Sequence, residues 1–257
     1  QVLQLSVEER KDYIEQHGAM LFETMLASIG VPEDELRDKV NYRLFIELLS
    51  AQMIPTDIMQ HLVEVLPTQR FLYKGIAEGE SDDVFTRSFA ALWLTGLFYV
   101  DQQTSFLTAE QAQLAMEQSL SYLNKERDVR GFVDIKGWVH SMAHGADLAA
   151  AILSHPHAKV QYGAVILQGV KESFWKGRVY TDDEDERLVK IFEVFAKNNF
   201  PEDVLVEWME QVFDKLQRHL YEVGYTPELF MARTNTMQFA KTLYFTLKFS
   251  GKYDKLR

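Results

Sequence analysis

The sequence predicts an all-α fold: a HEAT- or armadillo-like stack of about five antiparallel helix pairs, forming one elongated domain over residues 1–257. Three observations predict it. Apolar residues recur at helical spacing along most of the chain, strand-like alternation is almost absent, and all six prolines lie between apolar segments. Apolar helices of similar character begin at intervals of 46, 53, 50 and 48 residues, near Asp38, Val84, Gly137, Arg187 and Asn235. A period of about 40–50 residues is typical of helix-pair repeats that stack around a concave surface. An irregular bundle, whose spacing reflects helix length alone, is the alternative.

Each predicted helix has a local signal. Ser6 followed by Glu9 forms a capping box that opens the first helix, and Gly30 ends that helix. Several prolines are followed closely by acidic residues, which suits the first turn of a helix. The segment VLQLSV near the start is a weak strand candidate and is better interpreted as a tail. The predicted helices cover residues 7–30, 32–40, 55–66, 81–100, 108–127, 137–153, 158–177, 182–198, 201–213 and 226–238.

Composition excludes several classes of function. A net charge of -11 disfavours nucleic-acid partners and anionic membrane surfaces, because both require clustered Lys and Arg. The absence of cysteine removes disulfide scaffolds, thiol catalysis, iron–sulfur clusters and cysteine-bound zinc. We see no signal peptide and no apolar run long enough to span a membrane, so a cytoplasmic location is expected. Phosphate-loop, dinucleotide and serine-hydrolase motifs are also missing, and the sequence requires no cofactor.

The stretch GWVHSMAHGADLAAAILSHP, residues 137–156, holds four of the seven histidines. On a helix over residues 136–153, four polar residues fall within about 80° of one another. They are Lys136, His140, His144 and Asp147. The opposite side carries Trp138, Met142, Ala149 and Leu153. The sequence therefore predicts one polar stripe on an otherwise apolar helix.

Three interpretations of this stripe stay open. It is a solvated or hydrogen-bonded helix face, a polar ligand-binding groove, or a metal or acid–base site. His140 and His144 have the spacing of two metal ligands, and with Asp147 they are the catalytic candidates. However, HSMAH lacks the Glu of the HExxH motif, and His140 and Asp147 would lie about 10.5 Å apart along the helix axis. One ion bound by all three residues would be strained.

Three segments together resemble a bacterial family known as domain of unknown function 2785. They are VFTRSFAAL (84–92), ERDVRGFVDIKGWVHSMAHGADL (126–148) and EDERL (184–188). The resemblance implies a cytoplasmic, all-helical bacterial protein with no established activity. The residues that match the family's pattern are Arg87, Asp128, Arg130, Gly131, Lys136, Trp138, His140, His144, Asp147 and Arg187.

If equivalent faces of successive repeats align, these residues would form a groove. Its predicted members are Arg87, Asp128, Arg130, Lys136, Trp138, His140, His144, Asp147 and Arg187. Such a groove would suit a protein segment or a small anionic molecule, through bidentate Arg contacts. The competing interpretation is that the charges pair with one another, for instance Arg130 with Asp147, and tie the repeats together. We therefore expect a non-catalytic binding or scaffold protein. The alternative is a metal-assisted or histidine-based hydrolase centred on the HxxxHxxD helix.

Overall fold

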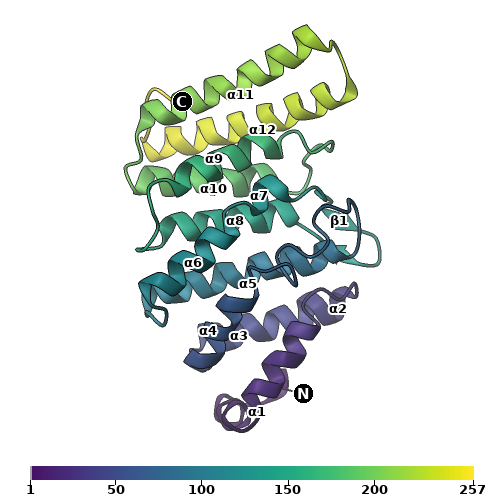
Figure 1. The fold of residues 1–257 in the computed structure, drawn as a ribbon, viewed down its shortest axis with the longest axis vertical. Coiled ribbons are helices and arrows are strands. Elements are labelled where there is room, and N and C mark those ends of the chain that lie inside the picture. Colours follow the sequence, from purple (N-terminus) through teal and green to yellow (C-terminus); the bar gives the residue numbers. More distant parts are fainter. Residues whose placement is uncertain (1) are drawn as a thin grey trace.

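A computed structural model describes residues 2–257 and confirms the all-α prediction. Ten helices of eight or more residues pack side by side (Figure 1). They are α1 (Val7–Ala27), α3 (Arg43–Ser50), α4 (Thr56–Val65), α5 (Asp83–Gln103), α6 (Ala109–Ser119), α8 (Ser141–Ser154), α9 (Tyr162–Ser173), α10 (Glu184–Lys197), α11 (Glu202–Glu222) and α12 (Pro227–Ser250). The shorter elements are η1 (Val2–Gln4), α2 (Asp34–Leu36), a π-helical segment η2 (Arg37–Tyr42), α7 (Tyr122–Lys125) and the strands β1 (Phe132–Val133) and β2 (Gly137–Trp138).

The helices form two rows. In one row α3 packs on α5, α5 on α8, α8 on α10, and α10 on α12. In the other row α4 packs on α6, and α7 on α9, while α11 packs beside α12. The chain climbs from α1 at one end of the molecule to α11 and α12 at the other (Figure 1). From α3 onward the chain alternates between the rows, except that the successive helices α6 and α7 lie in the same row. Each row brings together helices that are far apart in the sequence.

Local sequence signals explain most helix boundaries. The capping box at Ser6 forms as predicted, with the Ser6 hydroxyl accepting from the Glu9 amide and the Glu9 carboxylate accepting from the Ser6 amide. Pro227 lies in the first turn of α12, after the side-chain cap of Thr226. The first helix ends at Ala27, before Gly30, and the segment predicted as one helix over 108–127 is divided into α6 and α7. Residues 2–4 form a short 3-10 turn rather than a strand.

The helix predicted over 137–153 is wrong at its start. It begins only at Ser141, because residues 131–139 form a hairpin in which β1 and β2 pair antiparallel. The amide of Val139 donates to the carbonyl of Gly131 at 2.8 Å, and Gly137 turns the chain at φ +77°. Lys136 and Trp138 therefore do not share a helix with His144. The predicted polar stripe is wrong at Lys136, and the predicted apolar side opposite to it is wrong at Trp138.

The centre of the molecule is α8. Every residue from Ser141 to Leu153 is buried, so this helix lacks the broad exposed face of a surface helix. Gly145 permits this packing, since a Cβ there would lie 2.8 Å from Leu123 and 2.9 Å from the ring of Tyr122. One hydrophobic core continues on either side of α8, from Ile14 in α1 to Leu247 in α12.

Within residues 2–257 no helix combines the length and the apolar character that crossing a membrane requires.

Candidate functional site

A cleft of about 450 Å³ opens where η2, α5, α8, α10 and the β2 strand meet. Its walls come from segments that are widely separated in the sequence. They carry Asp38, Tyr42, Phe89, Leu92, Thr95, Tyr99, Trp138, His140, His144, Asp147, Arg187 and Lys190. Five of these were predicted from the sequence: Trp138, His140, His144, Asp147 and Arg187.

Arg87 is a predicted groove residue that the structure places elsewhere. It is fully buried inside the molecule, and its guanidinium binds both carboxylate oxygens of the equally buried Glu126, at 2.6 and 2.8 Å. Its third contact is the carbonyl of Lys74 at 2.7 Å. A bidentate pair with no exposed atom is unavailable to a ligand, so Arg87 joins α5 to the segment after α7.

Asp128, Arg130 and Lys136 also lie outside the cleft. Arg130 binds Asp128 at 2.6 Å and the carbonyl of Ser81 at 2.8 Å. Lys136 pairs with Asp82 at 2.8 Å near the surface. The pairing of Arg130 with Asp147 that the sequence suggested is therefore wrong, and these charges link the hairpin segment to the start of α5.

His144 is held in one tautomer by Ser88. The Ser88 hydroxyl donates to the carbonyl of Val139, so its oxygen accepts the Nδ1 proton of His144, at 2.7 Å. The Nε2 atom then carries a lone pair, which makes no hydrogen bond within residues 2–257. His144 is 8 % exposed, and burial lowers its pKa to about 3, with His140 and Arg187 acting in the same direction. The ring is therefore neutral near pH 7 and offers an acceptor to the cleft that it lines.

His140 lies directly before α8 rather than within it. It is the N-cap residue and adopts a left-handed conformation at φ +49°. Its ring stacks on Trp138, with centroids 4.3 Å apart, and its Nε2 atom is buried without a partner among the described residues. Burial lowers the pKa of His140; nearby Asp182 opposes this effect and Arg187 adds to it.

Aromatic rings make a continuous wall along one side of the cleft. Phe89 contacts His144 edge-on at 5.6 Å, and His144 contacts His140 edge-on at 5.8 Å. Trp138 continues the wall beyond His140, and Tyr42 lies against Phe89 at 5.9 Å. Such rings offer a flat apolar surface on which a planar group of a ligand can stack.

The cleft also carries charged side chains. Asp147 is 9 % exposed and pairs with Arg187 and, at 3.6 Å, with the Nζ of Lys190. Arg187 and Lys190 lie one turn apart on α10, and both keep part of their side chains exposed. Burial and the carboxylates of Asp147 and Asp38 raise the pKa of Tyr42 to about 12, so its hydroxyl remains a hydrogen-bond donor.

Sequence reasoning missed Asp38, Tyr42, Ser88 and Lys190. The first two come from η2, where a short π-helical segment interrupts the regular helix; such segments occur frequently at functional sites. No residue pattern announced this segment. Lys190 could have been found, because it follows Arg187 by three residues and so shares its helix face.

Arg37, which sequence reasoning also missed, holds two of the segments that line the cleft together. It is fully buried against the ring of Phe85, 4.1 Å from the centroid. Its guanidinium donates to the carbonyls of Lys136 and Trp138, at 2.6 and 3.3 Å. Arg37 thereby fixes η2 to the hairpin that carries Trp138.

Metal binding would need further ligands. Across residues 2–257, no group of three or more His, Asp or Glu side chains is arranged to hold a metal ion. Of the three candidates named from the sequence, Asp147 is already neutralised by two cationic side chains, which leaves His140 and His144. Two imidazoles alone are fewer than the three protein ligands of a catalytic zinc site.

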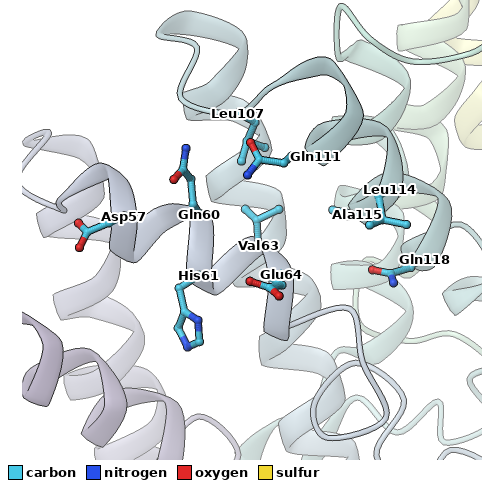
Figure 2. Close-up of a pocket in the computed structure, with 10 residues that line it drawn as sticks. All are labelled: Asp57, Gln60, His61, Val63, Glu64, Leu107, Gln111, Leu114, Ala115 and Gln118. Atoms are coloured by element: carbon cyan, nitrogen blue, oxygen red, sulfur yellow. The ribbon is translucent and has the colours of Figure 1, made fainter.

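A larger cleft, of about 680 Å³, lies between α4 and α6 (Figure 2). None of the predicted residues lines it. Asp57, His61 and Glu64 are exposed there, and Figure 2 shows Asp57 and His61 projecting away from the α6 side chains. The polar groups of the smaller cleft, by contrast, are nine-tenths buried at His144 and Asp147. Buried polar groups must be positioned by the fold, so the smaller cleft is the better candidate site.

A family model described as "Protein of unknown function (DUF2785)" matches residues 72–245. No curated protein and no solved structure matches the chain. The matched stretch includes ten of the twelve residues that line the cleft, while Asp38 and Tyr42 precede it.

Proposed function

The chain belongs to the DUF2785 family of proteins of unknown function, as its sequence segments indicated, and from its cleft we propose that it is a ligand-binding protein rather than an enzyme. The observation that carries this proposal is the pair of histidines in the cleft. His144 has its tautomer fixed by Ser88, and its Nε2 lone pair makes no hydrogen bond among the described residues. The Nε2 atom of His140 is buried without a partner there. A buried polar atom without a partner, such as the Nε2 atom of His140, is costly, and a hydrogen-bonding group of a ligand would satisfy it.

The surroundings of His144 suggest the class of ligand. The aromatic wall favours a flat ring, and Arg187 with Lys190 favours a carboxylate or phosphate. A cleft of about 450 Å³ suits one small molecule, or a few side chains of a protein segment. We propose a small aromatic anion that also carries a hydrogen-bond donor.

The chemistry of the cleft supports binding over the alternative, a hydrolase. A general base works best when its pKa is near the working pH. His144, with a pKa of about 3, is therefore a poor general base near neutral pH. Asp147, the other candidate base, is occupied by Arg187 and Lys190. Water activation by these residues is therefore disfavoured.

We also propose that the two rows of helices form a HEAT-like superhelix of five pairs. The row of α3, α5, α8, α10 and α12 supports it. Each of these helices would be the second member of a pair, and each packs on the second member of the next pair. The cleft lies on the exposed side of this row, where a repeat stack presents its binding surface. A cytoplasmic location stays a prediction that rests on the absence of cysteine and on the resemblance.

A thermal-shift screen tests the binding proposal. The probes are aromatic carboxylates and phosphates, each with its uncharged amide or alcohol analogue. We expect the anions to stabilise the protein by about 2–3 kcal/mol at a hundredfold excess over Kd, and the neutral analogues to have little effect. Arg187→Gln should weaken binding at least tenfold, because it removes the bidentate contact.

The matched control is Arg178→Gln. Arg178 is an exposed arginine outside the cleft, where it pairs with Glu80, so this substitution should leave binding unchanged. Equal binding of the neutral analogues, or no binding by any probe, would overturn the proposal. Hydrolysis of chromogenic esters or phosphates that disappears in His140→Ala/His144→Ala would favour the hydrolase.

A further inference from the structure

A second, apolar groove of about 490 Å³ lies between the end of α11 and the start of α12. Phe213 and Leu220 line it from α11, Phe230 and Met237 from α12, and Tyr225 from the turn between them. Arg233 is the one charged residue among those that line it. The groove is separate from the aromatic cleft, since the two share no lining residue.

The groove continues as a stripe along the exposed side of α12. At 100° per residue, six side chains fall within about 80° of one another, in the order Phe230, Arg233, Met237, Lys241, Tyr244 and Lys248. The buried residues of α12, such as Phe239 and Leu243, lie on the opposite side. Glu228, the acidic residue of this helix, is about 160° from Phe230 and hence outside the stripe. The stripe thus combines apolar and basic side chains without an acidic one.

This surface is unusual for the end of a helical stack. Terminal helices of repeat proteins normally present a polar outer face, because no further repeat covers them. Here α11 and α12 form the end of the molecule (Figure 1), yet Phe230 is 51 % exposed and Tyr225 is 77 % exposed. Exposed aromatic residues together with Met and Arg are the composition of a protein interface.

The charge of the region points to the occupant. Residues 227–257 contain six basic and two acidic residues, a net charge of +4, in a chain of net charge -11. The other 226 residues therefore carry -15. An acidic partner would be repelled by most of the protein surface and attracted to this one element.

We propose that the groove between α11 and α12 docks an acidic amphipathic helix of a partner protein. The apolar face of that helix fills the groove, and its acidic residues face Arg233, Lys241 and Lys248. The stripe is about 27 Å long, which is the length of a helix of about 18 residues. An anionic membrane fits less well, since the surface is a groove and the whole chain is strongly acidic.

Fluorescence anisotropy with labelled synthetic peptides tests this proposal. A panel of amphipathic helical peptides of about 18 residues carries Leu at helical spacing with Glu at the flanking positions, and a matched panel carries Lys instead. We expect members of the acidic panel to bind at least tenfold more tightly than their basic counterparts. The triple variant Arg233→Glu/Lys241→Glu/Lys248→Glu should lose this binding at least tenfold.

A charge-matched control separates local from global effects. Lys11, Arg70 and Lys197 are exposed on other parts of the molecule, so Lys11→Glu/Arg70→Glu/Lys197→Glu changes the net charge equally and should keep the binding. Circular dichroism melts show whether each variant folds. The proposal is overturned if no acidic peptide binds, if both panels bind equally, or if both triple variants lose binding equally. Two other results also overturn it: the protein sediments with phosphatidylserine vesicles without binding the peptides, or it forms a dimer that Phe230→Asp dissociates.

Discussion

Ser88 and His144 are 56 residues apart in the chain, and their contact decides the chemistry of the cleft. The hydroxyl of Ser88 has a single proton, which it gives to the carbonyl of Val139, so the imidazole must be the donor at Nδ1. Burial then keeps the ring uncharged and leaves Nε2 as an acceptor. Arg87 and Glu126 are also fully buried, but both stay charged because they form a complete ion pair with each other.

The lowered pKa of His144 predicts a pH-dependent stability. The unfolded chain binds a proton at His144 near pH 6.5, whereas the folded chain does so only near pH 3. Between these values the unfolded state holds more protons, so the free energy of unfolding falls as the pH falls, by up to about 1.4 kcal/mol per pH unit. Urea unfolding of the wild type and of His144→Gln between pH 7 and pH 4 measures this contribution.

The wild type should lose more stability on acidification than His144→Gln does. His17→Gln is the control for the loss of a histidine, because His17 is exposed on α1. Identical pH profiles for the wild type and His144→Gln would contradict the prediction.

The pair of Arg87 and Glu126 predicts a large loss of stability when one partner is removed. Glu126→Gln leaves a buried guanidinium without its counter-charge, which costs about 3–5 kcal/mol in the free energy of unfolding. The double variant Arg87→Met/Glu126→Leu should lose less, since no charge is left unpaired. Lys136→Met, at the partly exposed pair with Asp82, should change stability by less than about 1 kcal/mol. Chemical denaturation compares the variants, and a similar loss in Glu126→Gln and Lys136→Met would contradict this account.

At the scale of elements, the irregular segment before α8 shapes the cleft more than the regular helix α8 does. The hairpin of β1 and β2 replaces the first turn of the predicted helix, and it turns Trp138 toward His140. The π-helical segment η2 supplies Tyr42 from another part of the chain, and Arg37 joins it to the hairpin. Irregular elements therefore supply four of the twelve residues that line the cleft, around the regular helix α8.

Two glycines test how closely elements pack. A Cβ on Gly30 would lie 2.5 Å from backbone atoms of Thr86 on α5, and backbone cannot move aside as a side chain can. Gly30→Ala should therefore destabilise the protein by about 1–3 kcal/mol. A Cβ on Gly18, within α1, would lie 3.3 Å from side-chain ends of Ile14 and Ile58.

Gly18→Ala should stay within about 1 kcal/mol of the wild type, because the gain in helix propensity offsets a small adjustment of these side chains. Thermal denaturation of both variants measures the difference. If Gly30→Ala is as stable as Gly18→Ala, the close approach of the Gly30 segment to α5 is wrong.

At the scale of the whole molecule, stability should decrease from the centre of the stack toward its ends. All but the last residue of α8 is buried, whereas α11 buries only four residues: Leu205, Trp208, Val212 and Leu216. Helices that contact only their neighbours can open without the rest of the stack.

Hydrogen exchange followed by mass spectrometry tests this gradient. We expect the slowest exchange in α8 and in the adjacent parts of α5 and α10, and faster exchange in α1 and α11. The physical reason is that opening an end helix exposes one interface, while opening α8 exposes several. Uniform exchange in one cooperative step would contradict the repeat-like behaviour that we propose for the stack.

The sequence by itself determined the helices, their approximate boundaries and five residues of the cleft. Helical periodicity, caps and prolines are local signals, and a spacing of three or four residues places side chains on one face wherever a helix forms. The hairpin before α8 and the start of α8 escaped this reasoning, because Ile135 and His140 are left-handed without being glycines, and Gly137 was the one local signal of a turn among the three.

Only the tertiary structure decided which charged residues pair internally and which face the cleft. Arg87 and Arg187 look equivalent in the sequence, yet one is fully buried against Glu126 and the other lines the cleft beside Asp147. The reason is that burial depends on which distant segment covers a residue. That covering is set by the packing of helices about 40–60 residues apart, which no local pattern records.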